Sequence, residues 1–514
     1  MEAQPLLLLL ITILISTIFI FLRRGRRGGL PLPPGPKGWP ILGNLPHLGP
    51  KPHQTMHALS KLHGPLFRLR LGSAEVIVAA SAPIASEFLR THDTNFSNRP
   101  PNSGAEHIAY NYNDLVFAPY GPRWRTLRKL CALHLFSQKA LEDLCYVREQ
   151  EVAILARDLA GSCRPVNLGE TLNVCATNAL SRATIGWRVF VGKGEDVTAE
   201  EFKDMVMEVM RLAGVFNIGD FVPGLGWLDL QGVVGKMKKL HKRMDAFLDK
   251  LIAEHRAAVA GGELAGKHLL SVMVRLQEEG EGEGGKLTDT EIKALLLNLF
   301  TAGTDTTSST VEWALAELIR HPQLLHQAQK ELDTVVGHDR LVSESDLPHL
   351  PFLSAVIKET FRLHPSTPLA LPRMASESCT INGYHIPKNA TLLVNVWAIA
   401  RDPAVWAAPV EFKPDRFMPG GDGAHLDVKG SDFEMIPFGA GRRICAGMSL
   451  GLRMVTFMTA TLVHGFDWKL PNGVVAEKLD MEEAYGLTLQ RAVPLMVLPV
   501  PRLAKQAYGK HEKL

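Results

Sequence analysis

The chain has 514 residues, of which 46% are hydrophobic and 21% are charged, an ordinary globular composition with enough apolar side chains for a large core. Lys and Arg exceed Asp and Glu by only 56 − 53 = 3, so the net charge gives no reason to expect a nucleic-acid partner. The six cysteines are scattered without a Cys-x-x-Cys pair, which indicates neither a disulfide framework nor a structural zinc site.

Residues 1–29 are predicted to form a membrane anchor followed by a basic stop. Apart from three hydroxyl side chains, residues 5–22 are all apolar, and as a helix they would span about 27 Å, just enough for a bilayer core. Four arginines follow between Arg23 and Arg27, whereas only Glu2 precedes the apolar run. A cleaved signal peptide carries its positive charge before the apolar run, whereas here the charge comes after it, and no small-residue cleavage site follows. We therefore expect a single-pass helix in the endoplasmic reticulum, with the rest of the chain in the cytosol.

Residues 30–50 are dense in proline, which cannot continue a helix, and are predicted to form a stiff, extended hinge. β-type runs at 66–71 and 75–81 flank Gly72-Ser73 and predict a hairpin. From about residue 83 to 270 most segments show helical spacing. Later elements are a helix at 351–363, short strands around 380–384 and 391–396, a loop-rich stretch at 401–441, and a last helix that begins after Cys445 and ends near 463. The pattern predicts a mainly helical domain with a small β part.

One long helix is predicted to cross the whole domain. Thr288 and Glu291 have the spacing of a capping box, and His321-Pro322 ends the helix after Arg320. Its middle, Ala302-Gly-Thr-Asp-Thr-Thr307, contains one Gly and three β-branched Thr, which are poor helix formers. A weak point in an otherwise strong helix predicts a local distortion used for function.

The most informative stretch is a glycine-rich loop that delivers one cysteine, Cys445, to the start of an apolar helix. The helix N-terminus and the nearby Arg443 both favour a thiolate, which is a strong electron donor to haem iron. A dinucleotide-binding loop would need a third glycine after Gly439 and Gly441. That position is occupied by Ile444, so this type of loop is excluded. A buried structural cysteine is the other alternative.

Four motifs in order resemble the cytochrome P450 family. The pattern Phe-x-x-Gly-x-Arg-x-Cys-x-Gly resembles its haem-binding loop, with matches at Phe438, Gly441, Arg443, Cys445 and Gly447. Glu359-x-x-Arg362 resembles the characteristic helix pair of the family, and Arg416 in Pro-Asp-Arg-Phe its third partner. Residues 302–307 resemble the oxygen-activation motif. The resemblance implies the cytochrome P450 fold, mainly α with a small β part, in a haem-thiolate monooxygenase domain at 51–514 that follows the anchor and hinge.

The resemblance also implies a cofactor and residue roles. Haem b (iron protoporphyrin IX) would be bound through Cys445 as the axial iron ligand, and Asp305 and Thr306 would deliver protons to the distal oxygen. The alternative for Thr306 is a hydroxyl that bonds back to the carbonyl four residues earlier. The remaining roles are haem contacts for Trp124, Arg128, Arg373, Phe438, Gly441, Arg443 and Gly447, and a structural ionic network for Glu359, Arg362 and Arg416.

Electrons would come from NADPH through NADPH–cytochrome P450 reductase, with cytochrome b5 as a further candidate partner.

The helix that contains Trp124 and Arg128 has two different flanks. Trp124 and Arg128 lie four residues apart and share one helix face. Arg125 and Lys129 lie on the other flank, where they are surface charges that could also help to dock an acidic reductase.

A narrower resemblance concerns the substrate. Residues 76–81 and 426–434 are similar to those of plant flavonoid 3′-hydroxylases, which add a hydroxyl to the B-ring of a flavonoid. Leu426 replaces the usual Val, and Gly-Gly-Asp-Gly at 420–423 replaces Gly-Gly-Glu-Lys, so 5′-hydroxylation or a methoxylated flavone substrate stays open. Segments that line the pocket in this family are 101–120, 215–222, 298–306, 365–371 and 485–489, with Asn298, Ala302, Leu369 and Thr488 as candidate contacts. These segments carry no cationic clamp, which favours a neutral, planar substrate over a fatty acid.

Two functions of other classes remain as alternatives. A haem-thiolate isomerase or dehydratase would rearrange a peroxide without dioxygen or reductase, but such enzymes tend to lack the acid–alcohol pair present at Asp305-Thr306. A non-catalytic haem sensor at the membrane would show no turnover.

Overall fold

The computed structural model describes residues 30–190, 197–262, 268–280 and 286–509. The predicted anchor at 1–29 lies outside these residues. Within the described ranges, no helix is both long enough and apolar enough to span a bilayer.

The proline-rich segment lies against the folded body. Its carbonyl at Pro34 accepts a hydrogen bond from Arg68 N at 2.8 Å, and that at Pro31 accepts one from His385 N at 2.8 Å. Asn44 N donates to Arg70 O at 2.5 Å. Residues 31–44 are therefore joined by backbone hydrogen bonds to the edge of the first strand and to the hairpin of β5 (Cys379–Ile381) and β6 (Tyr384–Ile386).

The predicted hairpin is confirmed and forms one edge of a four-stranded sheet. Its order is β1 (Leu66–Leu71), β2 (Ala74–Ala79), β7 (Thr391–Val394) and β4 (Arg373–Met374), with β2 and β7 parallel and the other pairs antiparallel. Three smaller sheets pair β5 (Cys379–Ile381) with β6 (Tyr384–Ile386), β9 (Glu483–Ala484) with β10 (Gln490–Arg491), and β11 (Met496–Pro501) with both β3 (Val166–Asn167) and β8 (Phe466–Lys469).

Helices are the main secondary structure of the described chain, as the sequence predicted. In the first half they are α2 (Pro52–His63), α3 (Ala82–Ser86), α4 (Ser103–His107), α5 (Pro122–Cys131), α6 (Gln138–Asp143), α7 (Cys145–Ala160), α8 (Leu168–Ile185), α9 (Val197–Ala213), α10 (Ile218–Phe221) and α11 (Val233–Ala260). In the second half they are α12 (Leu269–Glu279), α13 (Asp289–Arg320), α14 (Pro322–Val335), α15 (Pro351–Leu363), α16 (Val396–Ile399) and α17 (Met448–Gly465). Single turns of 3-10 helix include Pro414–Phe417 and Gly441–Arg443.

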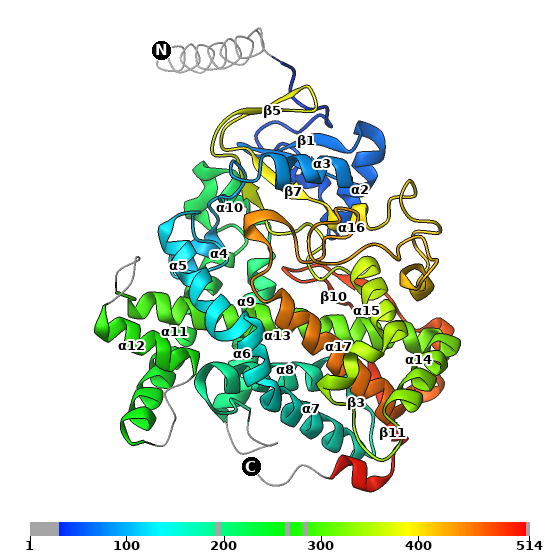
Figure 1. Cartoon of the computed structure of the whole chain (residues 1–514). Coiled ribbons are helices and arrows are strands. Elements are labelled where there is room, and N and C mark those ends of the chain that lie inside the picture. The colour runs from blue at the N-terminus through cyan, green and yellow to red at the C-terminus, as the bar shows by residue number, and fades with distance from the viewer. Residues whose placement is uncertain (1–29, 191–196, 263–267, 281–285, 510–514) are drawn as a thin grey trace, which may run out of the picture.

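Helix α13 crosses the middle of the molecule and packs against α8, α9, α15 and α17 (Figure 1). It begins at the predicted capping box, in which Glu291 N donates to Thr288 Oγ1 at 3.2 Å and Thr288 N donates to Glu291 Oε2 at 2.9 Å. Because most of its residues are buried, packing rather than helix propensity stabilises it.

The predicted distortion in the middle of α13 is wrong, because the helix is continuous from Asp289 to Arg320. The threonines of the weak stretch donate their hydroxyls to carbonyls four residues earlier, including Thr304 to Phe300 O at 2.6 Å and Thr307 to Gly303 O at 3.0 Å. These bonds satisfy the buried hydroxyls within the helix, so poor propensity is overridden without a break.

Candidate active site

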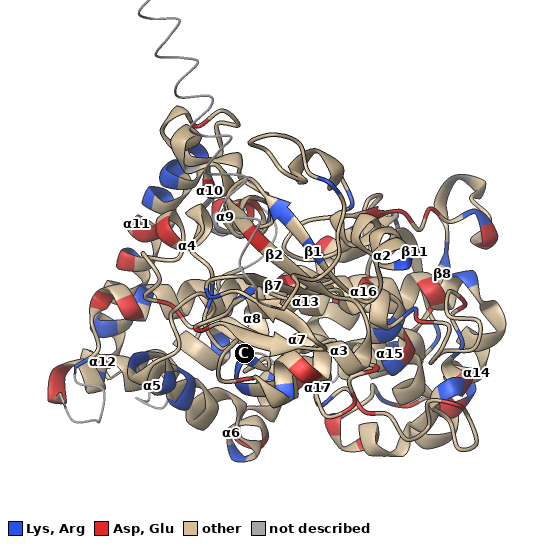
Figure 2. Cartoon of the chain, turned by 90° about the horizontal axis from the view of Figure 1, so that it is seen from above, with Lys and Arg blue, Asp and Glu red and all other residues tan. Residues whose placement is uncertain are grey.

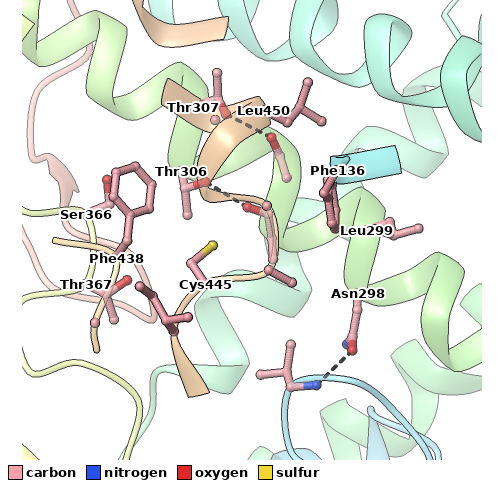
Figure 3. A pocket seen from close by; sticks show the side chains of 18 of the residues that line it. Phe136, Asn298, Leu299, Thr306, Thr307, Ser366, Thr367, Phe438, Cys445 and Leu450 are labelled. Atoms are coloured by element: carbon pink, nitrogen blue, oxygen red, sulfur yellow. Dashed lines mark hydrogen bonds between the residues drawn. The ribbon is translucent and has the colours of Figure 1, made fainter. Parts of the chain in front are cut away.

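A cavity of about 310 Å³ lies beside α13, between it, α5, the start of α17 and the loop that carries Cys445 (Figure 3). Segments far apart in sequence meet here, since Trp124, Thr306, Ser366 and Cys445 all line it. Of the residues predicted for the site, the lining includes Trp124, Arg128, Asn298, Ala302, Thr306, Arg373, Phe438, Arg443, Cys445 and Gly447.

The backbone of the glycine-rich loop sets the position of Cys445. Cys445 N donates to Phe438 O at 2.9 Å, which closes the loop, while Gly439 and Gly441 adopt positive φ angles of 70° and 67°. A Cβ at Gly441 would collide with the Asp93 carboxylate and the Leu89 carbonyl. Gly441 was predicted to contact the cofactor, but it is not among the described residues that line the cavity. The positive φ of Gly441 and its close approach to Asp93 and Leu89 require a glycine at this position.

The Cys445 thiol is open to the cavity but lies deep within the protein. Burial raises the pKa of Cys445, while the Gly447 N–H and the charge of Arg128 act in the opposite direction. Arg443 was predicted to be the cation that favours the thiolate. Arg443 instead donates from Nε to Ser97 O at 2.8 Å and also bonds Ala118 O, so Arg128 is the cation that acts on the sulfur.

Cationic side chains gather at one end of the cavity. Arg373 Nη2 donates to Ala440 O at 2.6 Å, and the guanidinium of Arg443 lies 4.5 Å from the centre of the Trp124 ring. Burial lowers the pKa of both Arg373 and Arg443 to about 10, and in Arg443 the neighbouring Arg373 charge adds to the effect. Arg443 Nη1 is buried with no hydrogen-bond partner among the described residues. An orphaned donor of this kind fits an anionic group of a ligand.

Sequence reasoning missed one member of this cluster. Arg99 lines the cavity and donates from Nη1 to Leu371 O and Pro372 O, each at 2.8 Å, and from Nε to Val116 O at 3.0 Å. It follows Asn98 in an irregular segment with no motif, so only the folded contacts identify it. The lining also includes Leu115, Phe136, Thr310, Ser366 and Thr367, which the sequence did not single out individually.

On α13, the two residues of the predicted acid–alcohol pair lie in different surroundings. Thr306 lines the cavity, and its hydroxyl donates to Ala302 O at 2.7 Å (Figure 3). The Asp305 carboxylate is buried outside the cavity lining, where it accepts hydrogen bonds from the Thr488 hydroxyl and from Gln490 Nε2, the latter at 2.7 Å. Burial raises the pKa of Asp305, and these two bonds oppose the increase.

Two predicted pocket residues, Leu369 and Thr488, are not among the described residues that line the cavity. Leu369 packs in the cluster of the β1–β2–β7 sheet, and Thr488 holds Asp305. Segments 215–222 and 485–489 likewise contribute no lining residue among those described. For Thr488 the cause is its contact with Asp305, which turns the hydroxyl toward α13, and for Leu369 it is packing against the sheet.

The predicted ionic network forms beneath the cysteine loop. Glu359 Oε1 and Oε2 accept a bidentate pair of bonds from Arg362, each of 2.7 Å, and Arg416 Nε donates to the same carboxylate at 3.2 Å. Glu359 and Arg362 are completely buried. The remaining amino group of Arg362, Nη1, donates to the backbone carbonyls Ala400 O and Pro409 O, each at 2.7 Å. The network therefore ties α15 to the loop-rich stretch before Cys445.

The donor set fits haem b. The cavity places a cysteine sulfur near Thr306 of α13 and has an orphaned guanidinium nitrogen among several cations, as an iron ligand and propionate contacts require.

Comparisons with known proteins agree with this geometry. The family model described as Cytochrome P450 matches residues 33–497. The chain is 69% identical over 504 residues to a Flavonoid 3'-monooxygenase of Crocosmia x crocosmiiflora, a match that covers 97% of this chain and 98% of the relative. It is 58% identical to a Flavonoid 3',5'-hydroxylase of the same plant, with both chains covered in full. A solved zebra fish cytochrome P450 with progesterone superimposes with a TM-score of 0.74 at 27% identity, covering 88% of this chain and 99% of that one.

Proposed function

The chain belongs to the cytochrome P450 family, and from this we propose that it is a haem-thiolate monooxygenase that hydroxylates the B-ring of flavonoids at the 3′ position with dioxygen and NADPH-derived electrons. The observation that carries this proposal is 69% identity to a Flavonoid 3'-monooxygenase across nearly the whole of both chains. The activity of a Flavonoid 3',5'-hydroxylase, a relative at 58% identity, is the second candidate.

The cavity supports a flat, weakly polar substrate. Aliphatic side chains such as Leu115, Val116 and Ala302 line it beside the hydroxyls of Ser366 and Thr367. Such a lining buries an aromatic skeleton and leaves a few groups that can bond phenolic oxygens.

We assign Cys445 as the iron ligand and Trp124, Arg128, Arg373 and Arg443 as the groups that hold the haem propionates. The bound haem would supply the reductive activation of dioxygen. Thr306 would hold a proton at its hydroxyl oxygen, inside the cavity and on the helix above the sulfur. Asp305, the preceding residue on α13, is proposed as the source of that proton; burial raises the pKa of its carboxyl, and delivery requires the carboxyl to leave Thr488 and Gln490 and turn toward the cavity.

The reductase is proposed to dock on the outer flank of α5. This helix buries Trp124 and Leu127 but exposes Arg125 and Lys129, so it presents positive charge to solvent (Figure 2). Such a surface attracts an acidic redox protein, NADPH–cytochrome P450 reductase first and cytochrome b5 as a further partner. The apolar run at 5–22 is proposed to hold the enzyme in the endoplasmic reticulum membrane with the catalytic domain in the cytosol.

Replacing Thr306 with Ala is expected to uncouple the reaction. Product formed per NADPH consumed should fall by roughly tenfold or more, because the cavity loses the hydroxyl that holds the proton. Peroxide release should rise in proportion, and measuring NADPH, peroxide and product in the same reaction checks the expectation.

Two variants control this test. Thr306→Ser keeps a hydroxyl and should retain most of the coupling. Thr304→Ala removes a hydroxyl that also donates to the carbonyl four residues earlier, but from a buried position outside the cavity lining, so it should stay coupled. If Thr306→Ala remains as coupled as Thr304→Ala, Thr306 does not hold the proton.

Product analysis tests the substrate assignment. Microsomes that contain this protein and a plant reductase would receive NADPH and a panel of 4′-hydroxylated flavonoids: a flavanone, a flavone, a flavonol and a 3′-methoxylated flavone. A single 3′-hydroxylated product from the first three is expected. Additional 5′-hydroxylation would favour the second candidate. Turnover of the methoxylated flavone alone would mean that the enzyme is specific for methoxylated flavones. If none is converted by enzyme with a normal carbonyl spectrum, the flavonoid assignment is wrong.

A further inference from the structure

The loop at 114–118 forms part of the cavity wall, where Leu115 and Val116 line the cavity. It follows three consecutive residues with positive φ, at Tyr110, Asn111 and Tyr112. Non-glycine residues rarely adopt this conformation, so the surrounding contacts must hold the segment in place.

Two side chains hold the backbone of the loop at 114–118 that follows this segment. Asn298 of α13, labelled in Figure 3, accepts hydrogen bonds at Oδ1 from Leu115 N at 2.8 Å and from Val116 N at 3.1 Å. Asp114 accepts at Oδ1 from Phe117 N at 2.8 Å and Ala118 N at 3.0 Å. The two side chains then join each other, since Asn298 Nδ2 donates to Asp114 Oδ2 at 3.0 Å. Four successive backbone N–H groups are thus held by one buried pair.

Both residues are committed to the loop. Asp114 is fully buried, and Asn298 is 8% exposed although it lines the cavity. The oxygen of Asn298 already accepts two bonds and one of its N–H groups is used, so its main role is to hold the wall rather than to bind a substrate polar group. Two further bonds hold the carbonyls of the same loop, from Trp124 Nε1 to Leu115 O at 3.0 Å and from Arg99 Nε to Val116 O at 3.0 Å.

We propose that Asp114 and Asn298 form a latch that fixes Leu115 and Val116 against α13 and thereby orients the substrate ring over Cys445. Both are positioning residues for the reaction, and their effect on the site of hydroxylation rests on the proposed flavonoid function. Because a small misplacement of the reacting carbon can cost about a hundredfold in rate, a loose wall would reduce both selectivity and coupling.

The pattern of donors and acceptors provides a sharp test. In Asp114→Asn, an amide N–H must face either Asn298 Nδ2 or the backbone N–H groups, so at least one bond is lost. In Asn298→Asp, two buried carboxylates face each other. In the double variant Asp114→Asn/Asn298→Asp every bond can form again. The introduced amide would accept from Phe117 N and Ala118 N and donate to the introduced carboxylate, which would accept from the N–H groups of the two wall residues.

Hydrogen exchange at residues 115–118 reads out the latch without substrate. We expect exchange to become about tenfold faster in each single variant, because these amides lose or weaken a hydrogen bond, and to return toward the wild-type rate in the double variant. In turnover of a 4′-hydroxylated flavanone, the single variants should form a mixture of hydroxylated products and release more peroxide, and the double variant should restore both measures.

The control is Asp346→Asn, which removes a charge from an Asp that also accepts a backbone bond, from Ser343 N at 2.8 Å, but lies outside the described cavity lining. It should leave product ratio and coupling unchanged. The latch is refuted if the single variants match wild type in exchange and product ratio. It is also refuted if the double variant has a normal carbonyl spectrum but restores neither exchange nor product ratio.

If the single variants fail to bind haem, Val116→Ala decides instead, since unchanged selectivity and KM would refute the role of the wall. If wild type converts no flavonoid, the proposed function fails, whereas the exchange measurement still decides whether the latch exists.

Discussion

Replacing Cys445 with Ser is expected to remove the red-shifted Soret band of the ferrous carbonyl complex and to reduce turnover by several orders of magnitude. A serine hydroxyl is close to the thiol in size, but it is a far weaker electron donor to iron. The arginine cluster at Arg128, Arg373 and Arg443 remains in place to bind the propionates, so some haem should still bind. The carbonyl difference spectrum, compared at equal haem content, measures the effect.

Cys163→Ser is the matched control, because Cys163 is an exposed free thiol outside the described cavity lining. It should show the wild-type spectrum and activity. An unchanged carbonyl band in Cys445→Ser would contradict the ligand assignment and would return Cys445 to the alternative of a structural cysteine.

Breaking the Glu359 network is expected to have the largest effect on stability. Glu359→Ala leaves Arg362 and Arg416 as buried guanidiniums without this carboxylate, and the removal of one partner from a buried ion pair costs about 3–5 kcal/mol. Because the network ties α15 to the segment before the cysteine loop, haem binding should fail along with folding. Yield of haem-loaded protein and the midpoint of thermal unfolding measure the effect.

The exposed pair Lys250–Glu254 offers the control, since both side chains are more than half exposed and 3.7 Å apart on α11. Glu254→Gln should change stability by less than about 0.5 kcal/mol. If Glu359→Ala and Glu254→Gln unfold at the same temperature, the network does not stabilise the fold.

Elements encoded by local patterns were predicted well from the sequence. The bounds of α13 follow from a capping box and a His-Pro boundary, and the β1–β2 hairpin follows from strand runs around Gly72-Ser73. Each of these signals lies within a few residues of the structure it predicts. The distortion of α13 failed because propensity alone ignores the hydroxyl bonds and burial that the folded helix provides.

The parts of the site that sequence reasoning missed depend on partners distant in the chain. Asp305 was expected at the cavity, but its orientation is set by Thr488 and Gln490, which lie 183 and 185 residues away. The identity of Asn298 as a latch likewise requires Asp114 from another segment. Spacing places a residue on a helix face, but it does not say which distant side chain will meet it.

The most direct test of the central claim is turnover of a 4′-hydroxylated flavanone under isotopically labelled dioxygen, with purified enzyme, reductase and NADPH. A monooxygenase must place one labelled oxygen atom in each product molecule, at the 3′ position, and must require NADPH. Unlabelled product, or product formed without NADPH, would contradict the account and favour the rearrangement chemistry of a haem-thiolate isomerase or dehydratase.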